Sequence, residues 1–315
     1  MSKNITARRR VPTKGPLRGV LYKIFRASLL LYLNGGTMEI VGDFSDVTAL
    51  QKYMSFAKFM DLIETNKIFL SKASGFEDKN EGGLSLEFRF LNDGSAMMLD
   101  VAMNHIFPSV RKLSPEERVE HEKKTEQLFE VIEKRINSTV FGDFPNNEFS
   151  YDDINKQYKE WIDVSCWHAN MHESMAMWKI YGESESSVCI VTNLEKIKSS
   201  FIPPDGYKMI IAKVEYISHD TDSFKIEHKL APFMHKSNFY TYEQEVRIIG
   251  YNSFCKFKEM RADFGTKIKL DITNLIQEIK VSPYAPNWFF ELVKSVCKKY
   301  DLDIPVNRSK IYGSL

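Results

Sequence analysis

The chain has 315 residues, of which 43% are hydrophobic and 13% are aromatic. This composition is sufficient to bury one large core or two modest ones, and it excludes disorder as the main state of the chain. The 43 basic residues nearly balance the 42 acidic ones. The molecule as a whole therefore has no field that would concentrate nucleic acid or an anionic membrane, and its partners have to be inferred from local sites.

Basic residues are concentrated at the start of the chain, where the segment before Glu39 carries eight of them and no acid. Its longest uncharged apolar run, Ala27–Leu33, is too short to span a bilayer, and no small-residue cleavage pattern follows it. We predict that residues 1–37 are a basic, disordered leader or an extension upstream of a start at Met38. A weak signal-like or transit-like segment is the alternative, and no stable membrane insertion is expected.

Apolar residues recur at helical spacing behind Ser55, a residue type that caps helix N-termini, which predicts a helix over residues 55–65. Residues 67–71 are typical of a short strand. Residues 75–83 have the composition of a polar loop. Its acids lack the oxygen spacing of a calcium loop, so we expect the loop to be solvated.

A helical insert is predicted in the middle of the chain. Ser114, Pro115 and the acid three residues after the serine form a helix-start signature, which indicates a helix to about Asn137. Residues 138–153 resemble a loop, and a second helix is expected over 153–161.

The remainder combines strands and helices without regular alternation, which favours an α+β fold with one sheet core. Residues 38–315 are expected to form a single domain with a helical insert at about 100–160. The expected strands are 164–168, 187–192, 209–216, 246–251 and 267–270, and the expected helices are 174–181 and 288–300.

Glu243 and Glu245 stand immediately before an apolar strand that begins at Val246. Residues two apart in a strand share a face, so the two carboxylates would be held side by side. Like charges this close raise the pKa of at least one of them when they are partly buried. The alternative is an exposed sheet edge at which these acids pair with Arg247 or Lys236.

Further motifs accompany this acid pair, namely Ser165–His168, Met177–Gly182 and the segment Lys236–Arg247 that contains it. Together they resemble a bacterial family catalogued as domain of unknown function 2971. That family has a cysteine-aromatic-serine strand, then Met-Trp-x-x-Tyr, a Gly-rich turn and a Cys-Ile strand. These are followed by a lysine, an aromatic residue, Tyr-Glu-x-Glu and an arginine. His168 departs from the pattern, because the family has a serine there.

The resemblance also includes the basic-aromatic pair Lys52-Tyr53 and the loop Phe76–Glu81, and it covers roughly residues 50–310. The loop lacks the Asn-Asp-Pro order that is more frequent in the family. The family in turn resembles the ADP-ribosyltransferases, which implies a mixed, split β-sheet core and NAD as the substrate. The site residues that this implies are Glu245 as the catalytic acid, Glu243 as the substrate-orienting acid, Ser165 or His168 on a middle strand, and Lys52 with Tyr53 on an early strand.

The implied chemistry is physically consistent with these residue types. Nicotinamide leaves from a cation-like sugar, so a carboxylate beside the ribose stabilises the developing charge. Glu243 would activate the attacking group. Tyr53, Trp167 or Tyr242 would stack on nicotinamide, although each is equally consistent with simple packing.

Two other arrangements use the same region. His168 and His172 are four residues apart and would share a helix face with Glu173 nearby, but their order is not that of a zinc protease, so no metal site is predicted. Cys166 and His168 would share a strand face as a nucleophile and base. A buried, inert cysteine is the favoured interpretation, because no third residue orients the histidine. The four cysteines lack CxxC spacing, which fits a reducing cytoplasm.

We therefore expect an NAD-dependent ADP-ribosyltransferase-like enzyme that acts on an unknown macromolecular acceptor or hydrolyses NAD, in the context of a toxin or phage-defence effector. One alternative is a non-catalytic module on the same fold that senses a ligand or partner. Another is a metal-dependent nuclease that uses the clustered acids.

Deletion of residues 1–37 is expected to leave the melting temperature nearly unchanged, because this segment has neither regular periodicity nor acids to complement its basic charges. Thermal unfolding of the full chain and of residues 38–315 measures the difference. A large loss of stability would show that Ala27–Leu33 packs as a structural element.

Overall fold

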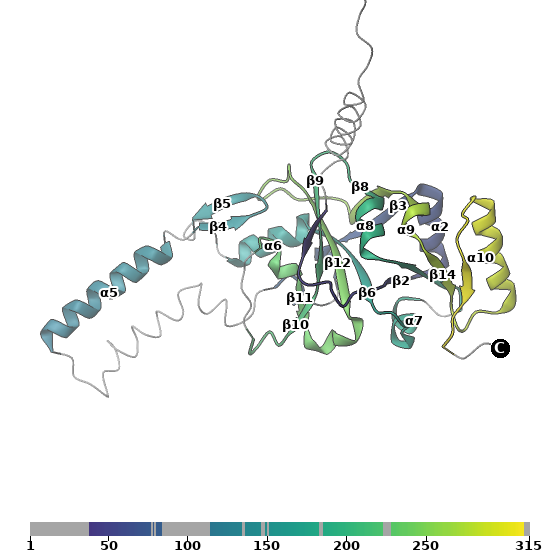
Figure 1. Ribbon diagram of the computed structural model, residues 1–315. Coiled ribbons are helices and arrows are strands. Elements are labelled where there is room, and N and C mark those ends of the chain that lie inside the picture. The colour runs from purple at the N-terminus through teal and green to yellow at the C-terminus, as the bar shows by residue number, and fades with distance from the viewer. Residues whose placement is uncertain are drawn as a thin grey trace, which may run out of the picture. The chain divides into compact units, whose positions relative to one another are not determined.

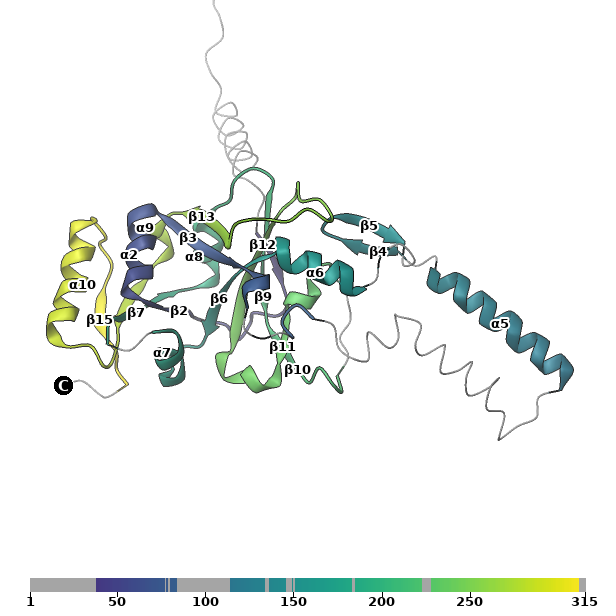
Figure 2. The same ribbon diagram turned by 180° about the vertical axis from the view of Figure 1, so that it is seen from behind.

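A mixed sheet of eleven strands is the centre of the fold (Figure 1, Figure 2). The computed structural model describes residues 38–76, 78, 80–83, 114–133, 136–145, 149, 151–182, 185–222 and 228–311. The prediction for residues 1–37 lies outside these ranges, as does the part of the predicted insert before residue 114. The expected α+β class with a mixed sheet core and helices inserted between its strands is confirmed.

Eight strands form the main path of the sheet, in which the first and last pairs are parallel and the others antiparallel. In sheet order they are β1 (Glu39–Val41), β9 (Tyr207–Lys213), β12 (Glu245–Asn252), β6 (Asp163–Ala169), β2 (Leu50–Ser55), β7 (Ser187–Thr192), β14 (Glu278–Val281) and β15 (Val306–Arg308). Three further strands branch from β6, in the order β3 (Lys67–Lys72), β13 (Gly265–Leu270) and β8 (Phe201–Ile202). Separate two-stranded sheets are formed by β10 (Glu215–Ile217) with β11 (His235–Ser237) and by β4 (Ile136–Thr139) with β5 (Gly142–Pro145).

The sheet splits along one edge of β6. At the end of this strand, His168 and Ala169 pair with β2, whereas at its beginning Asp163 and Val164 pair with β3. The opposite edge of β6 pairs with β12 from Asp163 to His168. Strand β6 is therefore the element that joins the two branches, and the predicted split sheet core is present.

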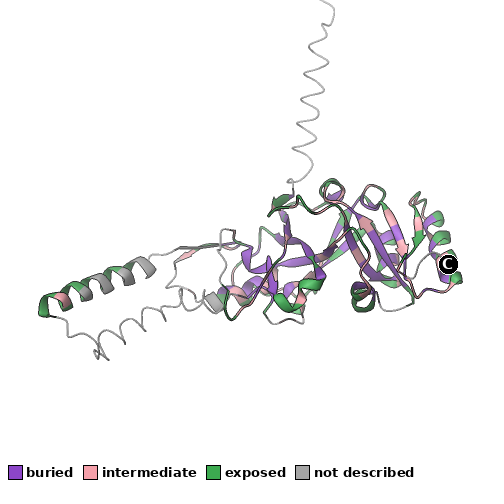
Figure 3. Cartoon of the chain, turned by 60° about the horizontal axis from the view of Figure 1, so that its bottom comes forward, coloured by how far each residue is buried: buried purple, intermediate pink, exposed green. Residues whose placement is uncertain are grey.

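Helices cover both faces of the sheet, with buried strands between exposed outer surfaces (Figure 3). In the described ranges, the α-helices are α2 (Phe56–Thr65), α5 (Pro115–Glu133), α6 (Tyr151–Trp161), α7 (Met175–Tyr181), α8 (Leu194–Ser200), α9 (Ile272–Leu275) and α10 (Asn287–Lys299), and the 3-10 helices are η1 (Ala73–Gly75), η3 (Ala231–Phe233) and η4 (Asn238–Glu243).

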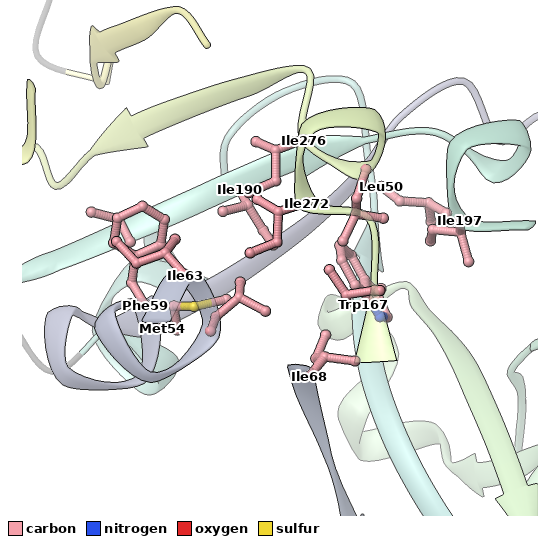
Figure 4. Close-up of a cluster of buried hydrophobic side chains, with 14 of the residues drawn as sticks. Leu50, Met54, Phe59, Ile63, Ile68, Trp167, Ile190, Ile197, Ile272 and Ile276 are labelled. Atoms are coloured by element: carbon pink, nitrogen blue, oxygen red, sulfur yellow. The ribbon is translucent and has the colours of Figure 1, made fainter. Parts of the chain in front are cut away.

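The larger core lies on the face that carries Leu50, Trp167 and Ile190, which pack against side chains of α2 and α9 (Figure 4). On the other face, Val164 and Ile249 pack against α6 and η3, and a small cluster beneath α7 contains Tyr53, Met177, Trp178 and Cys189. The face with the larger core is mainly apolar but also carries Lys52 of β2 and Ser165 of β6, whereas the other face combines an apolar half with polar side chains of β6 and β12.

Most predicted elements are present, and their boundaries have local causes. Ser114 and Glu117 form the predicted capping box, in which the amide of each residue donates to the side chain of the other at 2.8 and 3.2 Å. Asn66, with φ of 51°, ends α2 in the left-handed conformation.

Three predictions are wrong. The helix expected to run to about Asn137 ends at Glu133, and Asn137 belongs to β4. Residues 138–153 are not a loop throughout, because β4 and β5 form a hairpin that turns at Val140 and Phe141, and β5 begins at Gly142, whose φ is 119°. Residues 209–216 are not one strand either. Strand β9 ends at Lys213 because the chain turns at Val214, and β10 then pairs with β11 in a different sheet.

Among the described residues, no helix combines the length and apolar character needed to cross a membrane.

Replacing Phe59 by Ala is expected to lower the free energy of unfolding by about 3–5 kcal/mol, because this ring is fully buried in the larger core. Urea denaturation measures the loss. Phe239→Ala is the matched control, since Phe239 is 85% exposed, and it should change stability by less than about 0.5 kcal/mol. Equal losses in the two variants would contradict this description of the core.

Candidate functional site

The two acids Glu243 and Glu245 lie on either side of a left-handed turn. Helix η4 ends at Gln244, with φ of 42° and ψ of 57°, and β12 begins at Glu245. The amide of Ala169 donates to the Gln244 carbonyl at 2.8 Å, which ties the turn to the end of β6. Gln244 is exposed, whereas Glu243 and Glu245 are 4% and 3% exposed. Glu243 is therefore not on the strand, and the turn rather than strand alternation brings the two carboxylates together.

Lys236 of β11 joins the acids. Its Nζ lies 2.6 Å from Oε2 of Glu243 and 3.4 Å from Oε2 of Glu245. It also lies 3.1 Å from Oε1 of Glu81, which belongs to the loop after η1. Glu81 is 6% exposed, so the expectation that this loop is solvated is wrong at Glu81.

Arg247 lies on the same face of β12 as Glu245. It completes a group of buried charged side chains that we call the acid cluster, which consists of Glu81, Lys236, Glu243, Glu245 and Arg247. Its Nε and Nη2 donate to the two oxygens of Glu245 at 2.9 and 3.0 Å, and Nη2 also donates to Glu81. Nη1 donates to the carbonyl of Phe233 at 2.9 Å. Arg247 has no exposed surface. The alternative of acids paired with Lys236 and Arg247 is thus correct about the partners, but the pairs are buried and not at an exposed edge.

The cluster moves the pKa values of its two central acids in opposite directions. Burial raises the pKa of Glu243, and the hydrogen bond from Lys236 only partly offsets this effect. Burial also acts to raise the pKa of Glu245, but Arg247 and then Lys236 outweigh it and lower that pKa to about 2. Neighbouring acids with opposite shifts are a common feature of sites that carry out acid-base chemistry.

Two tyrosines that the sequence did not assign to the site contact the acids directly. The hydroxyl of Tyr181, at the end of α7, donates to Oε1 of Glu243 at 2.9 Å. The hydroxyl of Tyr216 accepts from the amide of Glu245 at 2.8 Å. Tyr181 belongs to the Met-Trp-x-x-Tyr motif that the family resemblance singled out, so this motif was a usable signal. Nothing in the sequence indicated Tyr216.

Gln51 and Glu245 are both register partners of His168, so these three side chains lie on one face of the sheet. Tyr53 is two residues after Gln51 on β2 and therefore lies on the same face. Nδ1 of His168 lies 2.5 Å from the carbonyl of Glu243, and burial lowers the pKa of this histidine. A neutral ring with its proton on Nδ1 donates to that carbonyl and thereby positions Glu243. Tyr53 donates to Oε1 of Gln51 at 2.5 Å and contacts the ring of His168 edge-on at 6.2 Å.

Lys52 and Ser165 lie on the opposite face. Nζ of Lys52 donates to Oγ of Ser165 at 3.0 Å and to the carbonyl of Cys166 at 2.9 Å. Between Val164 and His168, one edge of β6 pairs with neither β2 nor β3, and Cys166 lies in that gap. Lys52 therefore satisfies a backbone carbonyl at the split in the sheet, and the structure does not place it beside the acids' carboxylates.

The remaining candidates occupy different positions. Tyr242 is 43% exposed, outside the acid cluster, with its ring 6.4 Å from that of Tyr240. Burial raises the pKa of the Cys166 thiol well above its ordinary value, which disfavours a thiolate nucleophile. His168 lies on a strand, so the helical premise of the histidine metal site is wrong. Within the described ranges, no group of three His, Cys, Asp or Glu residues is arranged to hold a metal ion.

Two surface hollows have volumes of about 630 and 420 Å³ and lie away from the acid cluster. The larger is lined in part by Phe149, Phe257 and Lys258 beside α6, and the smaller by Cys297 and other residues of and after α10. None of the predicted site residues lines either hollow. The carboxylic acids of the cluster are buried, since Glu81, Glu243 and Glu245 are 6%, 4% and 3% exposed.

Neither a protein-family model nor a curated protein matches the sequence. Among solved structures, DarT from Thermus sp. 2.9 in complex with NAD+ is similar at 9% sequence identity and a TM-score of 0.34, over 86% of this chain and 100% of that one. The complex of the same protein with ADP-ribosylated ssDNA is similar at 9% identity and a TM-score of 0.33, over 87% and 99% of the two chains. TM-scores of this size do not establish a common fold.

The shift at Glu245 predicts a pH dependence of stability. Glu245 stays ionised in the folded chain down to pH about 2, but it titrates near 4.5 when unperturbed. Its carboxylate therefore stabilises the fold above pH 4.5, and this contribution is lost as the pH falls toward 2. The difference in melting temperature between the wild type and Glu245→Gln should be largest above pH 4.5 and should shrink below it.

Asp46→Asn is the control for this measurement. Asp46 pairs with Lys213 at 2.6 Å, but the pair is exposed and screened by water. Its removal should have a small effect at every pH. A difference for Glu245→Gln that does not change between pH 7 and pH 3 would contradict the assigned shift.

Proposed function

We propose that this protein is an NAD-consuming enzyme of the ADP-ribosyltransferase kind, which transfers ADP-ribose to a macromolecule or to water. The observation that carries the proposal is the pair Glu243 and Glu245. Both buried carboxyl groups contact Lys236, and the pKa of Glu243 is raised whereas that of Glu245 is lowered. Such a pair supplies one group that stays charged and one that exchanges a proton, as glycosidic bond cleavage requires.

Glu245 has the properties of the group that stabilises charge. In the reaction, the bond between the nicotinamide nitrogen and C1′ of ribose breaks, and its electron pair leaves with nicotinamide. Positive charge then develops on the sugar. The Glu245 carboxylate is ionised across the whole neutral range, and Arg247 fixes both of its oxygens, so no reorganisation is needed when the charge appears.

Glu243 has the properties of the group that moves a proton. An acceptor hydroxyl or amine forms the new bond to C1′ and gives up a proton, which Glu243 takes. Its raised pKa brings it closer to the range in which a carboxylate works as a base near neutrality. Tyr181 and Lys236 each donate to one oxygen of Glu243, and Tyr242 next to it provides an exposed ring for stacking.

The relationship to the bacterial family of unknown function remains part of this proposal, as do the cytoplasmic location and a toxin or phage-defence role. Tyr53 and His168 support the proposal as residues that shape the acid side of the sheet. Lys52 and Ser165 support it only through the family resemblance, because their side chains engage each other on the other face.

A non-catalytic sensor on the same fold is the second candidate, and one observation favours it. Both acids are almost fully buried, and both oxygens of Glu245 already accept hydrogen bonds from Arg247. A metal-dependent nuclease has less support, because Glu81, Glu243 and Glu245 each already form an ion pair with Lys236, Arg247 or both.

Release of nicotinamide from NAD tests the proposal. Glu245→Gln should lower the rate by about a hundredfold or more, the usual effect of removing one electrostatic contact to a transition state. Glu243→Gln should spare NAD hydrolysis and impair transfer to an acceptor, because the amide cannot take the acceptor's proton.

Glu173→Gln serves as the matched control, since the Glu173 side chain is only 5% exposed, pairs with Lys280 at 3.5 Å and does not contact the acid cluster. It should keep its activity although it also loses an ion pair. Circular dichroism establishes that each variant is folded before it is assayed. Equal and small effects of the changes at 243 and 245 would favour the sensor, and activity abolished by a chelator would favour the nuclease.

A further inference from the structure

One carboxylate of the acid cluster comes from a segment far from the others in sequence. Glu81 follows η1, whereas the remaining charged members lie between Lys236 and Arg247. It is nevertheless buried to the same degree as they are. Its contribution to the site therefore depends on how its loop docks against the sheet.

A single oxygen of Glu81 receives two cationic donors. Oε1 lies 3.1 Å from Nζ of Lys236, and Nη2 of Arg247 donates to the same atom. Both donors are held by other groups, since Lys236 also contacts Glu243 and Glu245, and Arg247 also donates to Glu245 and to a backbone carbonyl. The donors therefore stay in place without Glu81. Two fixed cationic donors that converge on one oxygen are suited to an anionic oxygen of a phosphate.

The loop that carries Glu81 places this oxygen at the two donors, and its other hydrogen bonds are made within the loop. Gly83 and Asn80 form short-range bonds within the loop, to the carbonyl of Asn80 and the side chain of Asp78. Between residues 78 and 80–83 and the rest of the described chain, the hydrogen bonds are those of the Glu81 carboxylate. Gly82 has φ of +67°, and a Cβ there would lie 2.5 Å from the ring of Phe233. A glycine is thus required for the loop to come this close.

The charge balance of the cluster identifies Glu81 as the replaceable member. Three carboxylates share two cations, Lys236 and Arg247. Removal of Glu81 leaves two acids for two cations. Removal of Glu245 would instead leave Arg247 without the partner that engages it through two nitrogens.

We propose that Lys236 Nζ and Arg247 Nη2 form an oxyanion subsite for a phosphate oxygen of a dinucleotide, and that Glu81 fills this subsite as an internal plug that the substrate displaces. The identity of the ligand rests on the proposed function, whereas the plug itself does not. Displacement of Glu81 opens the cluster at Glu245, so substrate binding and exposure of the acid become one event.

Binding measurements on Glu81→Gln test the plug without reference to turnover. A neutral amide competes less well than a carboxylate for two cations, so ADP-ribose and inorganic pyrophosphate should each bind about tenfold more tightly or better, by isothermal calorimetry. Glu160→Gln is the control. Glu160 pairs with Lys72 at 2.9 Å in another part of the chain, and its loss should leave both affinities unchanged.

The outcomes separate this inference from the proposed function. If Glu81→Gln binds both probes more tightly while the wild type releases no nicotinamide from NAD, the subsite stands and the proposed function fails. If a folded Glu81→Gln binds both probes as the wild type does, the plug is refuted whatever the activity. Tighter binding of pyrophosphate alone would overturn the assignment to a dinucleotide.

A second measurement uses the wild type in case Glu81→Gln does not fold. Saturating ADP-ribose should increase hydrogen exchange at the amides of residues 80–83, because displacement of Glu81 removes the hydrogen bonds that hold their loop. Exchange that stays unchanged or slows on binding would overturn the proposal.

Discussion

The fully buried guanidinium of Arg247 is the constraint on which the rest of the site depends. A charge without solvent is tolerated only when it is paired and hydrogen-bonded, and removal of one partner of such a pair costs about 3–5 kcal/mol. In this conformation its acceptors are Glu245, which engages it through two nitrogens, the carbonyl of Phe233, and Glu81. These acceptors come from β12, the loop after η1, and η3, so one side chain fixes three segments relative to one another. Glu245, the proposed catalytic acid, therefore also stabilises the fold through its hydrogen bonds with Arg247.

The left-handed turn at Gln244 shows how this arrangement is maintained. A non-glycine residue in that conformation costs about 1–3 kcal/mol and persists only where its surroundings determine it. The bond from Ala169 to the Gln244 carbonyl, the bond from His168 to the Glu243 carbonyl and the ion pairs on both sides of the turn are those surroundings. Strain at the turn is thus offset by contacts made to the end of β6, which explains why the acids lie at this place in the sheet.

The parts of this structure that the sequence predicted are those governed by local rules. The capping box at Ser114, the helix behind Ser55 and the apolar strands follow from neighbours a few residues apart. Strand β2 escaped periodicity analysis because Gln51 and Lys52 interrupt its apolar pattern, and both are satisfied by bonds to segments more than a hundred residues away.

The same distinction applies to the site. Glu243, Glu245 and their partners Lys236 and Arg247 were identified because they are close together in the chain. Glu81 was missed because only the docking of a distant loop makes it part of the cluster. The role of Lys52 was also out of reach, since it depends on the gap that β2 and β3 leave along β6, a property of topology and not of any local pattern.

That gap has a consequence for how the chain acquires its structure. Strands β2 and β3, joined by α2, are synthesised about a hundred residues before β6, and each offers β6 an edge. Until β6 arrives, these edges have no partner in the main sheet at that position, and pairing across so long a stretch of chain is slow because loop closure has to precede it. Unpaired edges are the usual starting points of aggregation during folding. The arrival of β6 therefore pairs one edge of each strand, and their other edges are paired only when β7 and β13 follow.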